Sequence, residues 1–529
     1  MPGRKAYRKG HLLQIKAFKN AVEADFSLPE NVAAMKEAFA RVDAEKGADY
    51  PLIIGGERIM TDEKSVSISP STKEVLGHVS SASRELADRA IREAHKAYLA
   101  WSQTPVEERV AVTHRLAALL EEERFYFDAW MAEENGKNWA EADGEVCEAL
   151  DFFNSYAMYA AELDEGLKLM PTAEETCCKY IPIGVGLAVP PWNFPLSIPA
   201  GMMISAAVTG NTVVCKPSSD TPIVAYKFIE LAERAGFPKG VISFLPGKGS
   251  EIGDFIVEHP LTRFVNFTGS KKVGLRISQN AAKVADGQKW IKRVVAEMGG
   301  KNAIVVDSSA NLDKAAEGIA TSAFALQGQK CSACSRAIVL ADVYDELVDK
   351  VVAKAAEMGA DQGAGRDNHA MGAVVNQAAY DKIMGYIDIA KGEGKIVHGG
   401  HGDDSKGFYI EPTVVRDVPR TARIANEEIF GPVLAVVKAD TFEEALEIAN
   451  DTEYGLTGSL YSSDREHIQQ AKREFHVGNL YINHKSTGAV VLQHPFGGFN
   501  MSGTDAKTGT KGYLLNFVNL KSICETLDY

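Results

Sequence analysis

The sequence has few cysteines, no excess of positive charge and no long apolar run free of helix breakers. Its seven cysteines lack regular spacing, which excludes a dense disulfide framework and favours a reducing compartment. The formal charge of −14 argues against broad nucleic-acid binding. We therefore expect small-molecule or protein partners, no nucleic acid and no membrane, and a cytoplasmic location.

One uncharged run, residues 179–216 between two lysines, is long enough to span a bilayer. It contains five prolines, and a spanning helix tolerates one such breaker more readily than five. We predict buried strands and a loop there. The first 20 residues carry six Lys/Arg and no acid, which favours a solvated basic tail over a Ser-rich transit peptide.

At 529 residues, the chain predicts two to four domains. The residue pattern predicts a helix over 29–45, two strands around the Gly-Gly turn of YPLIIGGERI, and helices over 83–165. After residue 180, and again after 300, short apolar strands alternate with helical segments. This alternation is typical of a parallel α/β sheet.

LQGQKCSACSR (326–336) holds Cys331 and Cys334 at C-x-x-C spacing. The spacing fits half a zinc site, a redox dithiol, or one reactive thiol beside an ordinary neighbour. Zinc needs two further ligands, and the sequence has no second C-x-x-C or Cys/His cluster. We expect no metal site.

Two glycine-containing turns are candidate phosphate sites. FTGSKKVG (267–274) follows a predicted strand and opens a helix, so Gly269, Ser270 and Gly274 lie where backbone N–H groups suit a pyrophosphate. LPGKGSEIG (245–253), with Gly249, is similar. Plain strand-to-helix turns have the same composition, so neither motif decides the question alone.

Three polar side chains stand at the ends of apolar segments. Lys216, followed by Ser218 and Ser219, ends a strand where parallel sheets form ligand crevices, although a surface lysine is the alternative. Asn193, in the proline-rich VPPWNFP, is a candidate oxyanion donor or a turn cap. Glu297 ends VVAE, so it is either a partly desolvated general base or a solvated strand end.

Taken in order, PWNFP, FTGS, EMGGKN, GQKCSA and EEIFGPV (427–433) resemble the successive signatures of the aldehyde dehydrogenase family, from about residue 30 onward. The resemblance implies that Cys331 is the nucleophile and Glu297 the base that activates water. The Asn193 amide and the Cys331 N–H would stabilise the oxyanion. It also implies NAD or NADP as coenzyme, with four further contacts at Trp192, Lys216, Glu428 and Phe430.

The segment HKSTGAVVLQHPFGGFNMSGTDAKTG (484–509) resembles the branch of that family that oxidises glutamate γ-semialdehyde, formed from 1-pyrroline-5-carboxylate, to glutamate in proline degradation. This substrate carries an α-carboxylate and an α-amine. The alternatives are another acidic semialdehyde, such as succinic semialdehyde, and a non-catalytic protein on the same scaffold. The implied substrate-binding residues are Glu148, Phe194, Ser332, Gly488, Ala489 and Phe496.

Ser219 departs from the pattern of NAD-preferring relatives, which often carry glutamate at this place. A carboxylate near the adenosine ribose repels a 2′-phosphate, and two unit charges 4 Å apart cost roughly 1–4 kcal/mol. We therefore hypothesise that both NAD and NADP are used.

The resemblance implies an α/β fold with a Rossmann-like coenzyme domain over 41–165 and 183–297 and an α/β catalytic domain over 298–485. An N-terminal arm would occupy 1–40, and the substrate anchor loop and a small β flap would occupy 166–182 and 486–529. The strand edges of such a flap predict a homodimer or higher oligomer. Because the chain is too short for a fused proline dehydrogenase, a separate one is an expected transient partner.

Overall fold

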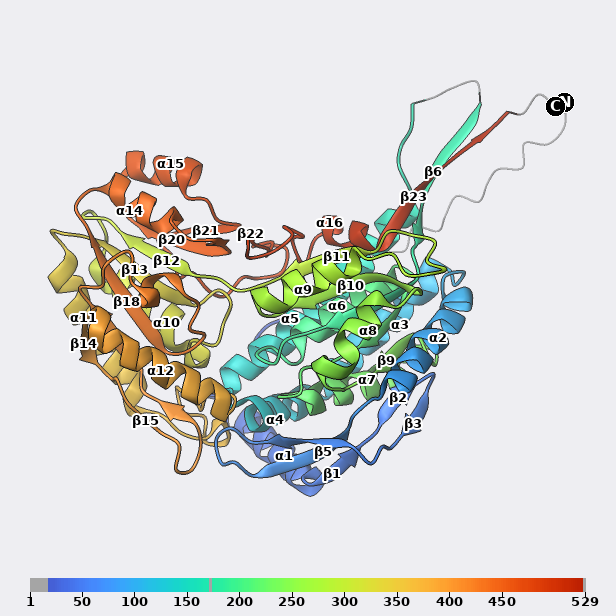
Figure 1. Ribbon diagram of the computed structural model, residues 1–529, viewed down its shortest axis with the longest axis horizontal. Helices are drawn as coiled ribbons and strands as arrows, with labels where there is room; N and C mark the ends of the chain where they lie inside the picture. Colours follow the sequence, from blue (N-terminus) through green and yellow to red (C-terminus); the bar gives the residue numbers. More distant parts are fainter. Residues whose placement is uncertain (1–17, 171–173, 527–529) are drawn as a thin grey trace.

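The computed structural model describes residues 18–170 and 174–526. Most of the basic segment interpreted as a solvated tail lies outside these residues. Figure 1 shows two lobes, each built on a large sheet, and a ribbon that projects from one of them. The predicted α/β class is confirmed.

The first sheet belongs to the lobe that carries α2, α3 and α5–α9 (Figure 1). Its central strands pair in parallel, and their chain order reverses between β7 and β10. Ligands of open α/β sheets bind beyond the carboxyl ends of the strands at such a reversal. In spatial order the strands are β11 (Arg293–Glu297), β10 (Thr262–Thr268), β7 (Val185–Val189), β8 (Thr212–Cys215), β9 (Ile242–Phe244), β2 (Leu52–Ile54) and β3 (Glu57–Ile59).

The second sheet belongs to the other lobe and is parallel except for its edge strand β14. Every residue of β12, NAIVV, is buried, as expected of a strand covered on both faces. The end of β11 leads within five residues to the start of β12, so the chain passes directly from one sheet to the other. In spatial order the strands are β14 (Lys395–His398), β17 (Thr413–Arg416), β18 (Val433–Ala439), β13 (Cys334–Leu340), β12 (Asn302–Val306), β20 (Thr457–Tyr461) and β21 (Asn479–Ile482).

Helices cover both sheets, and the predicted helix over 29–45 is confirmed as α1. In the first lobe they are α1 (Pro29–Glu45), α2 (Arg84–Trp101), α3 (Val106–Glu122), α4 (Arg124–Asn135), α5 (Trp139–Asp164), α6 (Ser197–Val208), α7 (Pro222–Ala235), α8 (Asp254–Glu258) and α9 (Lys271–Ala281). In the second lobe they are α10 (Leu312–Phe324), α11 (Tyr344–Ala360), α12 (Gln377–Glu393), α13 (Arg423–Asn426), α14 (Phe442–Asn450) and α15 (Arg465–Glu474). The short helix α16 (Lys511–Leu514) packs on α5 and α6 of the first lobe.

Smaller elements complete the described chain. The Gly-Gly turn predicted between two strands is confirmed, since Gly55 and Gly56 have φ of 59° and 82° between β2 and β3. The short strands are β1 (Ala48–Tyr50), β4 (Lys64–Ile68), β5 (Val75–Ser80), β15 (Gly402–Asp403), β16 (Tyr409–Ile410), β19 (Tyr454–Gly455) and β22 (Phe499–Asn500). Single turns of other helix types lie at Gly249–Gly253, Ala325–Gly328, Gly365–Asp367 and Leu515–Phe517.

Two expectations need correction. The uncharged run contains β7 and β8 as predicted, but it also contains the helix α6, which is almost wholly buried and so shows no amphipathic period in the sequence. Residue 40, the predicted end of the N-terminal arm, lies inside α1, whose buried side chains join the core beside α4. Among the described residues, no helix combines the length and apolar character needed to cross a bilayer.

The projecting ribbon in Figure 1 consists of β6 (Glu175–Pro182) and β23 (Val518–Glu525), which pair in antiparallel register along their full lengths. The two strands lie within the segments 166–182 and 486–529, which were predicted to contain the flap. Because this two-stranded ribbon leaves strand edges unpaired within the described chain, it offers a surface for a further strand.

Candidate active site

The loop before Cys331 has a strained backbone. Leu326 and Gln327 adopt left-handed φ values of 51° and 56°, although neither is glycine. Such conformations cost on the order of 1–3 kcal/mol each and persist where the surroundings enforce them. The Glu141 carboxylate of α5 accepts the Leu326 N–H at 2.6 Å, and the Gln329 side chain accepts the Val375 N–H at 3.0 Å. The protein therefore fixes the segment that presents the thiol.

The two cysteines of the C-x-x-C pair lie in different environments. Cys331 remains partly exposed, whereas Cys334 begins β13 and is buried in the hydrophobic core of the second sheet. Burial, with Glu297 and Glu428 nearby, raises the pKa of the Cys331 thiol to about 12. The resting thiol is therefore protonated and needs a base before it can attack. Within residues 18–170 and 174–526, no three His, Cys, Asp or Glu side chains form a group suited to a metal.

Two glycines after Glu297 let three segments approach one another closely. A Cβ at Gly299 would lie 2.4 Å from the Glu428 carboxylate, and one at Gly300 would lie 2.5 Å from the Cys331 carbonyl oxygen. The Gly300 N–H donates to Glu428 at 3.0 Å. The sequence EMGGKN thus joins the nucleophile loop to the EEIFGPV segment.

Asn193 lies against the nucleophile loop. Its side chain is buried, and its amide nitrogen donates to the Gln329 carbonyl oxygen at 2.8 Å. A carboxamide nitrogen carries two N–H donors, so one remains for an oxyanion. The geometry supports the oxyanion role over that of a turn cap, because the bonded carbonyl belongs to the loop that presents the thiol.

Glu297 ends β11 and is held by the C-terminal segment. The backbone on either side of it pairs with residues 502–504, and one carboxylate oxygen accepts the Gly498 N–H at 3.2 Å. The other oxygen is buried and has no hydrogen-bond partner in the part of the chain that the structure describes. Burial raises the pKa of this carboxyl well above its usual value. A buried carboxyl with a raised pKa and a free oxygen is suited to accept a proton.

Aromatic rings and a carboxylate mark the predicted nicotinamide side of the coenzyme cleft. The rings of Trp192 and Phe430 meet edge to face with centroids 5.4 Å apart, although they come from different lobes. Phe430 follows Glu428 and Ile429 in the same loop and has a left-handed φ of 61°. Burial raises the pKa of Glu428.

Lys216 stands at the carboxyl end of β8, as predicted. Its ammonium has no carboxylate partner among the described residues, and its hydrogen bond, to the Pro217 carbonyl, is 3.4 Å long. Burial lowers its pKa. Ser218 bonds weakly to Asp220, whereas Ser219 is exposed. A half-buried cation without a partner fits the hydroxyls or phosphate of a coenzyme.

The glycine turns differ in what they offer. Gly269 and Ser270 lie between β10 and α9, so α9 begins directly beyond the strand reversal. Gly274 is different, since its N–H already donates to the Ser270 carbonyl, and a Cβ there would lie 2.5 Å from the Met298 sulfur. Its role is close helix–strand packing. Gly249 begins a single turn before α8 and has open space around it.

The predicted substrate-binding residues Glu148, Phe194, Ser332, Gly488, Ala489 and Phe496 are here called the substrate mouth. One side of it comes from α5 and the loop after β7. Burial raises the pKa of Glu148 on α5 to about 7. The Lys137 ammonium lies 4.0 Å from the centre of the Phe194 ring and 2.6 Å from the Glu145 carboxylate. Glu145 in turn accepts the N–H groups of residues 196 and 197, where α6 begins.

The other side comes from the C-terminal loop. The Ser332 carbonyl accepts the Ser486 hydroxyl at 3.4 Å. This bond joins the loop that carries Cys331 to the start of the mouth loop, residues 485–495. Gly488 has a φ of 81° and is exposed, and Ala489 follows it without regular structure. The backbone of Phe496 pairs with that of Thr508. Phe496 lies two residues before Gly498, whose N–H donates to Glu297.

The chain resembles known proteins over nearly its whole length. The model of the aldehyde dehydrogenase family matches residues 59–523. The chain belongs to the aldehyde dehydrogenase family. It is 51% identical to a 1-pyrroline-5-carboxylate dehydrogenase of Geobacillus sp. (strain WCH70). The match covers 97% of this chain and 99% of that protein. The likeness extends to other members of the family whose structures are solved.

Among them is 1-pyrroline-5-carboxylate dehydrogenase from Thermus with bound NAD, which is 45% identical with a TM-score of 0.95 and covers 97% of this chain and 100% of that one. Proline utilization A from Bdellovibrio bacteriovorus is 41% identical with a TM-score of 0.94, over 96% of this chain and 53% of that chain. The aldehyde dehydrogenase fold predicted from the motifs is confirmed.

Sequence reasoning missed two lysines near the predicted site: Lys137, which is buried, and Lys330, which is half-buried. Lys330 precedes the nucleophile, and burial lowers its pKa while Glu141 opposes that shift. Lys137 forms the contacts with Phe194 and Glu145 described above. Adjacency to Cys331 was the available signal for Lys330. For Lys137 there was none, because only the fold brings it to the loop after β7.

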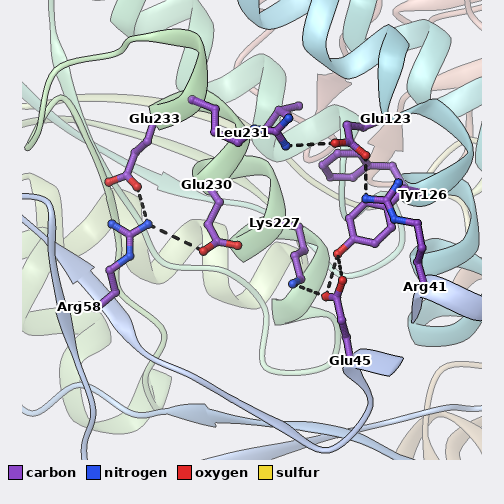
Figure 2. Close-up of a pocket in the computed structure, with 11 residues that line it drawn as sticks. Arg41, Glu45, Arg58, Glu123, Tyr126, Lys227, Glu230, Leu231 and Glu233 are labelled. Carbon is purple, nitrogen blue, oxygen red and sulfur yellow. Dashed lines mark hydrogen bonds and ion pairs between the residues drawn. The ribbon is translucent and has the colours of Figure 1, made fainter. Parts of the chain in front are cut away.

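One cavity lies elsewhere and contains none of the predicted site residues. It has a volume of about 370 Å³ and is lined by charged side chains from α1, β3 and α7, by Glu123 between α3 and α4, and by aromatic rings of α4 (Figure 2). These charges pair with one another, as Arg41 with Glu123 and Lys227 with Glu45. Each charged side chain that lines this cavity pairs with one of opposite sign, so among the described residues the cavity presents no unpaired charge to a ligand.

Proposed function

We propose that this aldehyde dehydrogenase oxidises L-glutamate γ-semialdehyde, formed from 1-pyrroline-5-carboxylate, to L-glutamate with NAD or NADP. The observation that carries the proposal is the likeness over 97% of the chain to 1-pyrroline-5-carboxylate dehydrogenases. This likeness includes the mouth loop as well as the chemical centre. Another acidic semialdehyde is the alternative substrate.

In the proposed mechanism, Cys331 attacks the aldehyde carbon after its proton has passed to a base. The Asn193 amide and the Cys331 N–H stabilise the oxyanion, and one such donor typically contributes 10²–10³-fold in rate. Glu297 then takes a proton from the water that hydrolyses the thioester on Cys331. Its raised pKa follows from burial, and its unbonded oxygen is free to receive that proton.

The coenzyme would be held by the residues of the cleft between the lobes. Lys216 would bind the adenosine ribose, with Ser218 and Ser219 beside it, and Glu428 would bind the nicotinamide ribose. Trp192 and Phe430 would line the ring, while the α9 N-terminus at Gly269 and Ser270 and the turn at Gly249 would face the phosphates. When bound, the coenzyme supplies the acceptor of the two electrons that leave the aldehyde carbon.

The mouth would recognise the amino-acid end of the substrate. Glu148 would pair with the α-ammonium, and the N–H groups of Gly488 and Ala489 and the Ser332 hydroxyl would bind the α-carboxylate. Phe194 and Phe496 would cover the aliphatic part. Lys330, a half-buried cation next to Cys331 in the chain, would add positive charge near the thiol.

We also propose that the β6–β23 ribbon joins copies of the chain into a homodimer or larger oligomer in the cytoplasm. A separate proline dehydrogenase would supply the substrate, and a transient contact with it is the expected arrangement. The likeness to part of proline utilization A supports this link.

The test is the rate of NADH or NADPH formation with glutamate γ-semialdehyde and with succinic semialdehyde, each with both coenzymes. A strong preference for glutamate γ-semialdehyde supports the proposal. A preference for succinic semialdehyde would leave the chemistry standing and overturn the assignment of the mouth. For the coenzyme, a large NAD preference in matched kcat/KM values would refute dual use, and Ser219→Glu should create that preference.

A further inference from the structure

Residues 18–28, the first described part of the chain, are bound firmly to α5. The Ala21 N–H donates to Asp151 at 2.8 Å, and the Ala24 N–H donates to Asp143 at 2.6 Å. Arg124 donates to the Val22 carbonyl at 2.8 Å. This segment therefore forms part of the wall around the helix that carries Glu148.

Asn20 joins this segment to the mouth loop. Its amide nitrogen donates to the Asp151 carboxylate at 2.7 Å and to the Val491 carbonyl at 2.9 Å. Its amide oxygen accepts the Gln493 side chain at 2.9 Å. One carboxamide thus connects a side chain of α5 to Val491 and Gln493 of a short turn. These two residues lie 471 and 473 positions after Asn20 in the chain.

The turn that Asn20 holds is strained. The N–H groups of Gln493 and His494 both donate to the Val490 carbonyl, and Leu492, which lies inside this turn, has a φ of 65°. A left-handed conformation costs about 1–2 kcal/mol for a residue with a Cβ. Such a turn keeps one shape only if its surroundings enforce it. Asn20 and the burial of Val491 in the core provide that enforcement.

We infer that Asn20 is a positioning residue for substrate recognition. It fixes the turn at Val491, two residues after Ala489, to Asp151, three residues after Glu148 on α5. Residues three apart on a helix lie on neighbouring parts of its surface. Asn20 thereby holds the two proposed sides of the mouth at a fixed spacing. The inference rests on the proposed function, since it assigns Glu148 and the Gly488–Ala489 backbone to the amino-acid end of the substrate.

The first experiment is Asn20→Ala in the full chain, assayed with glutamate γ-semialdehyde and with propanal, which lacks both the amine and the carboxylate. We expect KM for glutamate γ-semialdehyde to rise about threefold to tenfold, as the loss of one or two hydrogen bonds implies. The inhibition constant of the product L-glutamate should rise by a similar factor. The kcat/KM for propanal and the KM for NAD should change by less than about twofold.

Two further variants separate positioning from general stability. Lys19→Ala is the matched control, because this neighbouring side chain is exposed and has no hydrogen bond or ion pair among the described contacts. It should leave every constant unchanged. Gln493→Ala should raise the same KM less than Asn20→Ala, and it should add little in the double variant because both changes loosen one clamp.

An equal loss with both aldehydes would overturn the inference, since it would indicate a structural role alone. Unchanged KM and product inhibition in Asn20→Ala would overturn it as well. The parent chain tests the proposed function separately. If the parent oxidises propanal but not glutamate γ-semialdehyde, the proposed function fails before any variant is compared.

Discussion

The chemical centre and the substrate mouth of this aldehyde dehydrogenase are built in different ways. Glu297 ends a regular strand, and Cys331 follows a loop fixed by buried side chains and by glycines that admit close backbone contacts. The mouth loop has no regular structure from residue 485 to 495 and is held by hydrogen bonds to distant parts of the chain, namely the Asn20 side chain and the Ser332 carbonyl. The centre is therefore expected to fail completely when altered, and the mouth to lose selectivity by degrees.

The largest expected effect is the loss of the nucleophile. Cys331→Ala should reduce kcat by at least about 10⁴-fold, because no other group can form the thioester. Cys334→Ala is the control, since that thiol is buried in the core and should affect stability more than rate. Steady-state NADH formation and reaction with a thiol reagent measure both variants. Comparable activity loss in the two would contradict the assignment of the C-x-x-C pair.

The next effect concerns the base. Glu297→Gln should lower steady-state turnover about 10²–10⁴-fold while one equivalent of NADH still forms in a rapid burst. In the parent chain, burial raises the pKa of Glu297, so thioester hydrolysis should speed up as pH rises through that pKa and the carboxylate forms. The variant should lack this rise. If Glu297→Gln kept the pH profile of the parent chain and gave no burst of NADH, a residue other than Glu297 would be the base.

The proposed chemical centre could be located in the sequence because its residues occur in short contiguous motifs. The EMGGKN segment contains both the base and the two glycines that admit Glu428 and Cys331, so local sequence reflects the contacts. The strand and helix alternation likewise predicted both sheets. The helix α6 was missed because a wholly buried helix has no polar face to give a period.

The supports of the mouth could not be predicted in the same way. Lys137 reaches Phe194, and Asn20 reaches Val491, only after the chain has folded, and each is a single residue without a motif. The left-handed backbone at Leu326 and Gln327 was also hidden, because neither residue type favours it. Such features follow from tertiary contacts that enforce them.

A smaller and more selective effect is expected at Glu148. Its pKa is raised to about 7 by burial, so it is a carboxylate above that pH and neutral below it. The KM for glutamate γ-semialdehyde should therefore rise as pH falls below about 7. Glu148→Gln should raise this KM about tenfold at pH 8 and remove its pH dependence, with propanal as the control. An equal change with propanal would show that Glu148 does not contact the amine.

The smallest effect is expected at Gly488, whose φ of 81° strains any residue with a Cβ. Gly488→Ala should raise the KM for glutamate γ-semialdehyde about threefold to tenfold, because roughly 1 kcal/mol of strain shifts the N–H groups that bind the carboxylate. Gly488→Asn is the matched variant, since asparagine tolerates left-handed backbone better and should lose less. Both should keep the pH profile of the parent chain. If alanine and asparagine cost the same, the side chain rather than the backbone conformation disturbs the mouth, because a Cβ there lies 3.2 Å from the Lys485 side chain.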